Sequence, residues 1–489
     1  MTEPDEGIYY KAFTVLKRIS DYQFQEALHL IFTSNGRPLG VVVNLIPASL
    51  QVLWAKFFGL NVFETHSMPV IFFFNLVTYF LILYLVYKIA ILLFQNRNIS
   101  ILSILLYSLL TNSHIYLRHV LPYDLSLLFF LYVIYKLLYY FIFLNDCNIF
   151  IIFRLGIINF LGFMLYPGNF PLYLATFLIL IGFQLIQSFK KKYFLFSSIF
   201  AFVSGTILVI IPVEILSCIG KNSYIHSLQN LSGTILQGDF NESAVFLFKY
   251  MWDVEGITGI IWLVGVILYF IAFPKLLKNR PSYYKNSIMI FFILISLFVF
   301  YTVFLSYFLH KMVVYGRIIH QFIPILSIFS IVGYYLFYKK YIKAYGFLLV
   351  VFMMIIGIGN YLKNFFQYNQ IAYPKDVFWK YLRYTSPKII KEVSEYKESW
   401  SNLPSAHYIK NEKIIFKQDS ILAVNTQYFF PVEHLSKYKA YKVPVNYKLI
   451  FKGKHFLNFE AYQYEGYTPN ARKIIRKIHP DIKIYKLNQ

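Results

Sequence analysis

The feature that most constrains this chain is a series of apolar blocks, most of them about 18 to 25 residues long, that recurs through its first three quarters. At about 1.5 Å per residue, roughly 20 helical residues cover the roughly 30 Å hydrocarbon core of a bilayer. Inside that core backbone polar groups must be paired, and these runs do not alternate as barrel strands do. We therefore predict a mostly α, polytopic membrane helical bundle of about ten spans. These spans are expected at 67–94, 101–113, 122–143, 149–166, 168–187, 194–216, 256–273, 287–308, 319–338 and 346–362.

The positive charge of the chain follows its predicted topology. The net charge of +23 could suggest nucleic-acid binding, but Lys and Arg gather in short loops between apolar blocks and in the last third of the chain. The loops at 190–192, 275–285 and 339–343 are predicted on one side of the membrane, which the positive-inside rule makes cytoplasmic. We therefore expect a multi-pass protein of the bacterial inner membrane, with no nucleic-acid partner.

The chain divides by composition into three parts. Residues 1–66 are expected to form an extracytoplasmic catalytic-loop region with interfacial helices, 67–362 the transmembrane domain, and 363–489 a small extracytoplasmic α/β domain. The stretch 38–55 is apolar enough to span, but Asn44, Pro47 and Gln51 interrupt it, so we expect it along the interface or packed on the bundle. As a true span it would move the N-terminus to the cytoplasm. In the tail, 421–430 and 447–451 resemble strands and 470–478 a helix.

Charged and histidine side chains collect at the predicted extracytoplasmic surface. A carboxylate there can deprotonate an acceptor hydroxyl, and arginines can hold a phosphate bidentately. Such a set suits a reaction on a lipid-linked phosphate. The alternative is that Arg and His at helix ends anchor headgroups, and that Asp124 caps the following span. The candidates are Asp5, Glu6, Arg37, His66, Arg118, Asp124, Arg317 and His320.

Four short motifs occur in a recognisable order. They are DEGIYYKAF at 5–13, RPLG at 37–40 with FFGLN at 57–61, LRHVLPYD at 117–124, and the stretch from Arg317 to Pro324. In this order and approximate spacing the chain resembles the bacterial GT-C glycosyltransferases of the protein O-mannosyltransferase and aminoarabinose-transferase type (glycosyltransferase family 39-like). Each motif alone is weak, and together they extend over residues 5–340.

The resemblance implies an inverting transferase that moves a sugar from a polyprenyl-phosphate donor to a glycan, lipid or protein acceptor. It makes Asp5 the general base and Glu6 an orienting or metal-contacting neighbour, with no certain cofactor but room for a divalent metal. Arg37, His66, Arg118, Asp124, Arg317 and His320 would bind substrate or the lipid phosphate. The chain departs from the family in three ways: the family's first span is missing before Asp5, RPLG has one proline instead of two, and His66 stands where an Arg is usual.

Two other functions remain open from the sequence. A lipid-linked glycan flippase or transporter would move lipid without making a bond, although no row of charged residues crosses the predicted spans. An inactive GT-C relative that acts as a partner is the other alternative, and the missing span favours it. Phosphate-cradling and dinucleotide-binding glycine motifs, H-E-x-x-H and Cys-based metal spacings do not occur in the sequence. The donor should therefore be lipid-borne, and we expect no metal site of a recognised type.

Overall fold

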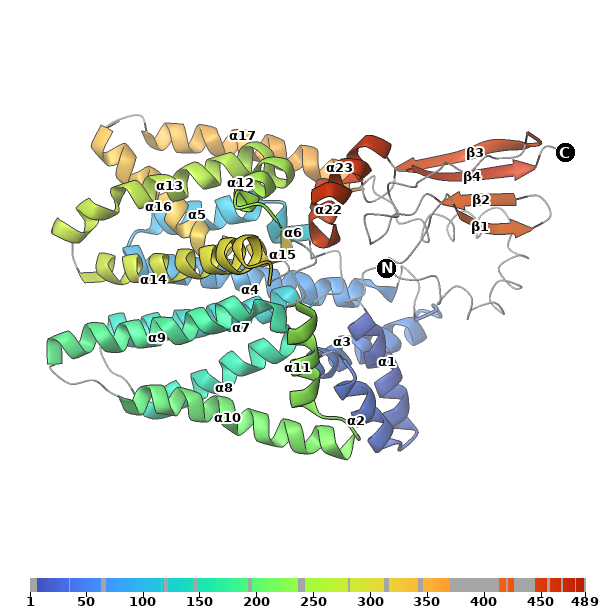
Figure 1. Ribbon diagram of the computed structural model, residues 1–489, viewed down its shortest axis with the longest axis horizontal. Helices are drawn as coiled ribbons and strands as arrows, with labels where there is room; N and C mark the ends of the chain where they lie inside the picture. The colour runs from blue at the N-terminus through green and yellow to red at the C-terminus, as the bar shows by residue number, and fades with distance from the viewer. Residues whose placement is uncertain are drawn as a thin grey trace. The chain divides into compact units, whose positions relative to one another are not determined.

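The computed structural model divides into two compact units, shown together in Figure 1. The helical unit comprises residues 5–239 and 243–361, and the C-terminal unit comprises residues 1–4, 240–242 and 362–489. The structure describes residues 7–34, 36–62, 67–115, 117, 122–144, 148–191, 196–235, 242–279, 282–311, 316–341, 346–369, 413–418, 421–425, 445–454, 458–467, 469–479 and 481–487.

The helical unit is built from α-helices with short π and 3₁₀ segments between them. The α-helices are α1 (Gly7–Ser20), α2 (Phe24–Phe32), α3 (Pro38–Phe57), α4 (Pro69–Phe94), α5 (Arg97–Leu109), α6 (Asn112–Ile115), α7 (Tyr123–Leu138), α8 (Ile149–Leu165), α9 (Phe170–Lys191), α10 (Phe196–Ile219), α11 (Tyr224–Ile235), α12 (Phe246–Tyr250), α13 (Gly256–Asn279), α14 (Ser282–Val299), α15 (Gly316–His320), α16 (Ile323–Tyr341) and α17 (Gly346–Asn369). The π segments are η4 (Tyr139–Leu144), η6 (Met251–Glu255) and η7 (Phe300–Phe308), and η5 (Pro167–Asn169) is a 3₁₀ turn.

Among the described residues, seven helical stretches are long and apolar enough to cross a membrane. They indicate a multi-pass integral membrane protein, as the sequence predicted. The seven stretches are Pro38–Phe57, Pro69–Phe94, Tyr123–Leu144, Pro167–Gln187, Phe196–Ile219, Phe246–Ala272 and Lys285–Phe308. Three predicted spans correspond to shorter apolar helices, at Arg97–Leu109, Ile149–Leu165 and Ile323–Phe337. The total of ten spans stays a prediction.

The outer surface of these helices is itself apolar, which suits lipid and not water. On α10, Phe196 and Phe200 are 73% and 74% exposed, and only 22% of the residues in its most apolar part are buried. A water-soluble protein seldom exposes a continuous apolar surface of this kind.

Helices in this unit approach each other closely at glycines. A Cβ on Gly156 of α8 would overlap the carbonyl group of Phe202 on α10, and one on Gly205 of α10 would overlap the carbonyl oxygen of Phe153. The same relation joins α13 and α16, where a Cβ on Gly333 would overlap the Gly265 carbonyl. In lipid, where apolar burial between helices gives little driving force, such close backbone contact supplies the dispersion attraction that holds helices together.

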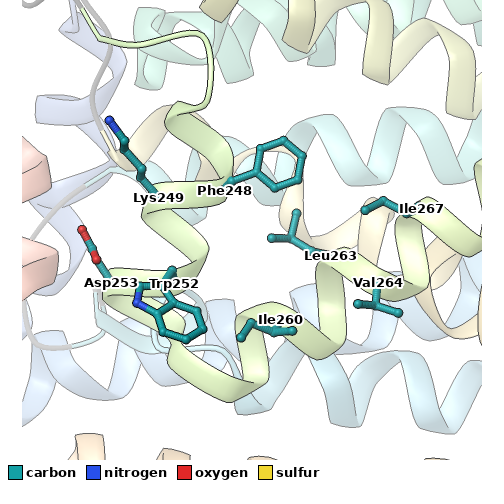
Figure 2. Close-up of a pocket in the computed structure, with 8 residues that line it drawn as sticks. All are labelled: Phe248, Lys249, Trp252, Asp253, Ile260, Leu263, Val264 and Ile267. Atoms are coloured by element: carbon teal, nitrogen blue, oxygen red, sulfur yellow. The ribbon is translucent and has the colours of Figure 1, made fainter.

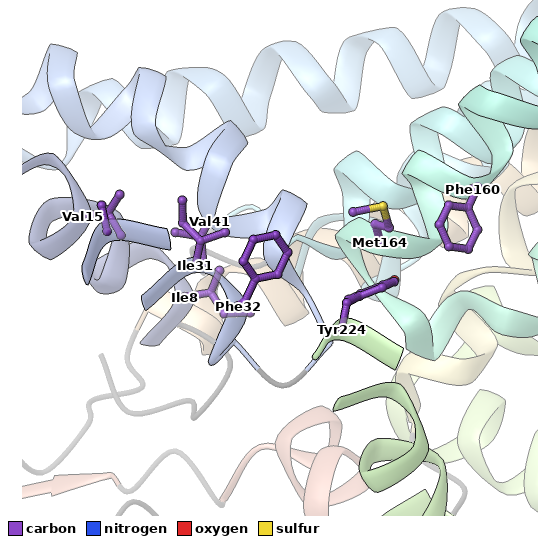
Figure 3. Close-up of a cluster of buried hydrophobic side chains, with 9 residues drawn as sticks. Ile8, Val15, Ile31, Phe32, Val41, Phe160, Met164 and Tyr224 are labelled. Carbon is purple, nitrogen blue, oxygen red and sulfur yellow. The ribbon is translucent and has the colours of Figure 1, made fainter. Parts of the chain in front are cut away.

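The first three helices pack against the bundle through a buried apolar cluster, shown in Figure 3. Its members come from α1, α2 and α3 on one side and from α8 and α11 on the other. They are Ile8, Val15, Ala27, Ile31, Phe32, Val41, Phe160, Met164 and Tyr224. Because this cluster fixes the start of α3 against the end of α8, it also fixes the residues that flank those two helix ends.

The C-terminal unit contains a four-stranded antiparallel sheet in the order β1-β2-β4-β3. Its elements are β1 (Lys413–Gln418), β2 (Ile421–Asn425), β3 (Tyr447–Lys454), α22 (Glu460–Gly466), α23 (Pro469–Ile478) and β4 (Asp481–Leu487). The expected strand at 447–451 coincides with β3 and the expected helix at 470–478 with α23, whereas β1 was not predicted. Of the expected strand 421–430, residues 426–430 lie outside the described residues.

Helix α23 is held within the C-terminal unit by a buried ion pair. Arg472 Nη1 and Nη2 donate to the two carboxylate oxygens of Glu242, at 2.5 and 3.0 Å. The guanidinium carbon also lies 4.1 Å from the ring centre of Tyr464 on α22. This two-point geometry is the favourable arrangement for Arg with a carboxylate.

Candidate functional site

Two of the predicted site residues, Asp124 and His320, form a buried pair in the helical unit. Asp124 lies in the first turn of α7 and His320 is the last residue of α15, 196 positions later. Asp124 Oδ1 lies 2.7 Å from His320 Nε2, and the two side chains are 7% and 1% exposed. The sequence analysis considered the Asp124 carboxylate as a possible helix cap. In the structure it has His320 as a partner.

The pair continues into a second carboxylate through Asn112 on α6. His320 Nδ1 lies 2.7 Å from Asn112 Oδ1, and the Asn112 amide nitrogen donates to the Tyr250 hydroxyl. The carboxylate of Glu255, which is fully buried, accepts the backbone N–H groups of Thr111 at 2.5 Å and Asn112 at 2.8 Å. We call Asp124, His320, Asn112 and Glu255 the carboxylate network.

The other two described candidates, Arg37 and Arg317, are joined by a pair of tyrosines. Arg317 Nη1 donates to the Tyr123 hydroxyl at 2.6 Å, and its guanidinium carbon lies 5.6 Å from that ring's centre. The rings of Tyr123 and Tyr166 are 4.3 Å apart, and the Arg37 guanidinium carbon lies 4.9 Å from the Tyr166 ring. We call these four residues the arginine–tyrosine series. Both arginines are half-buried.

The two groups adjoin because their members are neighbours in sequence. Tyr123 directly precedes Asp124 on α7, and Arg317 lies about one turn before His320 on α15. The arrangement therefore brings together residues of three of the motifs that the sequence analysis singled out: RPLG, LRHVLPYD, and the stretch from Arg317 to Pro324.

Prolines set the helix ends that carry these residues. Pro38 begins α3 directly after Arg37, Pro122 precedes α7, and Pro167 begins η5 directly after Tyr166. A proline suits the first position of a helix because its fixed φ is helical and the missing N–H would have no partner there.

Further polar contacts fix α7 against the turn that follows α8. Ser126 Oγ donates to the Gly162 carbonyl oxygen at 2.7 Å and accepts from Asn169 Nδ2 at 3.0 Å. The Gln321 side-chain oxygen, one residue after His320, accepts from the Leu172 backbone N–H at 3.3 Å. These contacts limit how far α7, α8 and α15 can move relative to one another.

The described part of the DEGIYYKAF motif lies on α1, where Ile8, Tyr9 and Ala12 are buried. The Tyr9 hydroxyl donates to Gln51 Oε1 of α3 at 2.6 Å, and Lys11 Nζ donates to the Thr33 carbonyl oxygen at 2.8 Å. Burial raises the pKa of Tyr9 and lowers the pKa of Lys11, because in both cases it disfavours the charged form. These two contacts anchor α1 to α3 and to the residue that follows α2.

The remaining candidates lie outside the described residues: Asp5, Glu6, His66 and Arg118. Within the part of the chain that the structure describes, no group of three or more His, Cys, Asp or Glu side chains gathers that could hold a metal ion.

Sequence reasoning missed Glu255, Asn112, Tyr123 and Tyr166 as members of these groups. A signal existed for Glu255, since it is a carboxylate within a long apolar stretch, where an ionisable residue is rare and usually functional. The comparisons with known proteins add no further identification: no family model, curated protein or solved structure matches the chain.

Proposed function

We propose that the protein is a glycosyltransferase of the GT-C type. It transfers a sugar from a polyprenyl-phosphate donor to an acceptor at the extracytoplasmic membrane surface. The observation that carries this proposal is the arginine–tyrosine series beside the carboxylate network. It brings four of the eight sequence candidates, Arg37, Asp124, Arg317 and His320, to one region of the helical unit. The family resemblance stated from the motifs supplies the reaction class.

In this proposal the two arginines bind the lipid phosphate. Each guanidinium lies against a tyrosine ring, which orients its planar donors while leaving the group partly accessible. A phosphate that leaves from a sugar gains negative charge in the transition state, and donors oriented beforehand stabilise that charge. Arg118 and His66 are proposed to contribute to the same binding on the strength of the motifs alone.

The chemical step balances with one base. The acceptor hydroxyl gives its proton to Asp5, with Glu6 beside it, and its oxygen attacks the anomeric carbon from the face opposite the phosphate. The bond from that carbon to the phosphate oxygen breaks, and the polyprenyl phosphate leaves with the electron pair. The configuration at the anomeric carbon inverts. Asp124 and His320 act as positioning residues that hold the start of α7 and the end of α15.

The proposed topology follows the sequence. Ten spans would put residues 1–66 and 363–489 outside the cytoplasm, with Asp5 in the same water layer as Arg317. A cysteine introduced at Thr2 should then react with a reagent that does not cross the membrane. Labelling only after the membrane is opened would overturn this orientation and the mechanism with it.

The direct test is sugar transfer in membranes from a synthetic polyprenyl-phosphate sugar. Arg317→Gln should lower kcat/KM by about a hundredfold or more, as the loss of a charge-stabilising donor does. The matched control is Arg154→Gln, an exposed arginine twelve residues before Tyr166, about 18 Å along α8. Asp5→Asn should abolish transfer.

The outcomes separate the alternatives. Full activity in Asp5→Asn would refute the proposed base, and equal losses in Arg317→Gln and Arg154→Gln would refute the phosphate site. Movement of labelled lipid across the membrane without a covalent product would point to the transporter. Neither activity, in protein that is folded, would point to the inactive relative.

A further inference from the structure

Helix α11 packs against the backbone that precedes Arg37. Gly36 comes directly before this arginine. A Cβ at Gly36 would lie 3.1 Å from Leu228 Cδ2 and 3.5 Å from Leu231 Cδ2. Both leucines belong to α11, and both are half-buried. The next atom is Pro167 Cγ at 3.9 Å, in the turn after α8. Gly36 is therefore packed against both α11 and that turn.

The backbone of Gly36 has a conformation that residues with a side chain rarely adopt. Its φ is +73°, in the left-handed region where a Cβ is strained. Because glycine has no side chain to restrict rotation about its own backbone bonds, neighbouring atoms must do so. Here the two leucines of α11 occupy the space next to the Gly36 Cα. They therefore limit the backbone rotations that would move Arg37 away from the Tyr166 ring.

The first turn of α11 is held by side chains of α10. The Glu214 carboxylate accepts hydrogen bonds from the Ser223 hydroxyl at 2.7 Å and from the Ile225 backbone N–H at 3.0 Å. Ser217 Oγ accepts the Tyr224 backbone N–H at 3.1 Å. Such N–H groups have no partner inside their own helix. These contacts fix where α11 begins, at the end of α10, from which it runs crosswise (Figure 1).

Burial holds the same turn of α11 against the bundle. The Tyr224 side chain is 1% exposed and belongs to the buried apolar cluster (Figure 3). Leu228 packs against that cluster about one turn later. Since α11 is fixed at its beginning by both polar and apolar contacts, the position of its leucines over Gly36 is fixed as well.

We propose that α11 is the positioning element for Arg37, with Leu228 and Leu231 as positioning residues. The inference rests on the proposed phosphate-binding role of Arg37 and deepens it. By packing against Gly36, the leucines hold the backbone in the arrangement that places the guanidinium against the Tyr166 ring. A cation that is oriented before its ligand arrives binds a phosphate more tightly, because less freedom is lost on binding. Neither leucine contacts the phosphate; each acts only through Arg37.

The plain alternative is that α11 only fills space and adds to stability. Truncation of Leu228 would then lower the free energy of unfolding and leave the phosphate affinity of the folded protein unchanged. The positioning role predicts a loss of affinity that disappears once the arginine is absent. A double-mutant cycle between Arg37 and Leu228 distinguishes the two explanations, because residues that act through one another have non-additive effects.

The test is binding of a short-chain polyprenyl phosphate to the purified full-length chain in mild detergent, measured by isothermal titration calorimetry. Leu228→Ala should weaken binding about tenfold, within the range of coupling between residues in contact. Arg37→Gln should weaken binding further, and Leu228→Ala/Arg37→Gln should bind no more weakly than Arg37→Gln. Leu228→Met nearly conserves the side-chain volume and should retain most of the affinity.

Two leucines serve as matched controls for the truncation. Leu30→Ala removes a half-buried leucine of α2 that packs against the same apolar cluster. Leu263→Ala removes a leucine of α13 that lines the surface groove between the α12–η6 segment and α13, shown in Figure 2. Both controls should bind the polyprenyl phosphate as the wild type does. Wild-type affinity in Leu228→Ala, a loss as large in the controls, or additive losses in the double variant would each overturn the positioning role.

Hydrogen exchange gives a second readout that needs no ligand. Arg37 donates its backbone N–H to the Ser34 carbonyl oxygen at 3.2 Å and accepts the Gly40 N–H at 3.1 Å. Leu228→Ala should speed exchange of these two amides about tenfold, because the segment opens more often. Leu30→Ala should not. Unchanged exchange in Leu228→Ala would overturn the proposal.

Failure of the proposed function gives a different result. The wild type would then bind no polyprenyl phosphate, or Arg37→Gln would bind it as tightly as the wild type does. The exchange measurement would still decide whether α11 holds the segment before Arg37.

A further variant releases α11 at its other end. Glu214→Ala removes the carboxylate that holds the first turn, so it should weaken polyprenyl phosphate binding and speed exchange in the same direction as Leu228→Ala. Glu26→Ala is the control, because this exposed glutamate of α2 forms an exposed ion pair with Arg18. It should behave as the wild type. Wild-type affinity together with wild-type exchange in Glu214→Ala would overturn the role given to α11.

Discussion

The carboxylate network and the arginine–tyrosine series are adjacent, yet they differ in how they are held. The network is buried: Asp124 and His320 are almost inaccessible, both His320 ring nitrogens have partners, and both Glu255 oxygens accept backbone N–H groups. In the series only the two arginines are half-buried, and their guanidinium groups rest against the rings of two buried tyrosines. A buried set of satisfied polar groups fixes helix ends, whereas partly accessible cations can still take up a ligand.

The difference predicts that the network controls stability and the series controls ligand binding. Substitutions in the network should therefore lower the free energy of unfolding by much more than substitutions in the series. The measurements below use unfolding of the detergent-purified chain.

The largest effect is expected for His320→Leu. It leaves the Asp124 carboxylate buried without its partner, which costs about 3–5 kcal/mol of unfolding free energy. The double variant Asp124→Leu/His320→Leu removes both polar groups and should be more stable than the single variant. If the double variant were less stable than His320→Leu, the two side chains would not be acting as a pair.

Next comes Glu255→Ala, with an expected loss of about 3 kcal/mol. The substitution removes the acceptor of two buried N–H groups, and each unsatisfied group costs about 1–3 kcal/mol. Glu255→Gln should recover part of the loss, because its amide oxygen can still accept one of the two bonds. Equal unfolding free energies for the two variants would contradict the role given to these hydrogen bonds.

A smaller effect, about 1 kcal/mol, is expected for Tyr166→Leu. It removes the ring that contacts both Arg37 and Tyr123, and aromatic and cation–π contacts of this kind contribute about 0.5–1.5 kcal/mol each. Tyr166→Phe preserves the ring and serves as the control. A loss in the Phe variant as large as in the Leu variant would assign the effect to the hydroxyl instead.

The smallest effect on stability is expected for Arg317→Gln, below about 1 kcal/mol, because the substitution removes a half-buried cation and leaves no buried charge without a partner. The same variant has the large expected effect on sugar transfer. A loss of unfolding free energy similar to that of His320→Leu would show that the arginine–tyrosine series contributes to stability as much as the carboxylate network does.

The sequence predicted most helices correctly because apolar block length is a direct requirement of the bilayer. At 38–55 the sequence predicted a helix in spite of the polar residues and the proline in its apolar run, and α3 runs unbroken from Pro38 to Phe57. The reason is tertiary: Gln51 is fully buried and bonded to the Tyr9 hydroxyl and the Val62 carbonyl oxygen. A polar residue within an apolar helix is tolerated when another segment satisfies it. Whether α3 crosses the membrane or lies along its surface stays a prediction.

The candidate site was predictable only in part. Arg37, Asp124, Arg317 and His320 stood out as charged residues at the ends of apolar blocks. Their partners did not, because Tyr123, Tyr166 and Asn112 are of residue types that occur throughout this chain. What distinguishes them is contact with segments far away in sequence, such as the 194 residues between Tyr123 and Arg317.

By itself, the sequence determined that this chain folds as helices in lipid, since long apolar segments can satisfy their backbone polar groups there only within a helix. It also determined which charged residues lie near helix ends. Only the tertiary structure decided which of those ends meet: that His320 lies between Asp124 and Asn112, that Glu255 holds the turn at Thr111, and that tyrosines join Arg37 to Arg317. These contacts depend on how side chains fill the space between the helices. That packing is decided by all the segments together, so it cannot be read from any one of them.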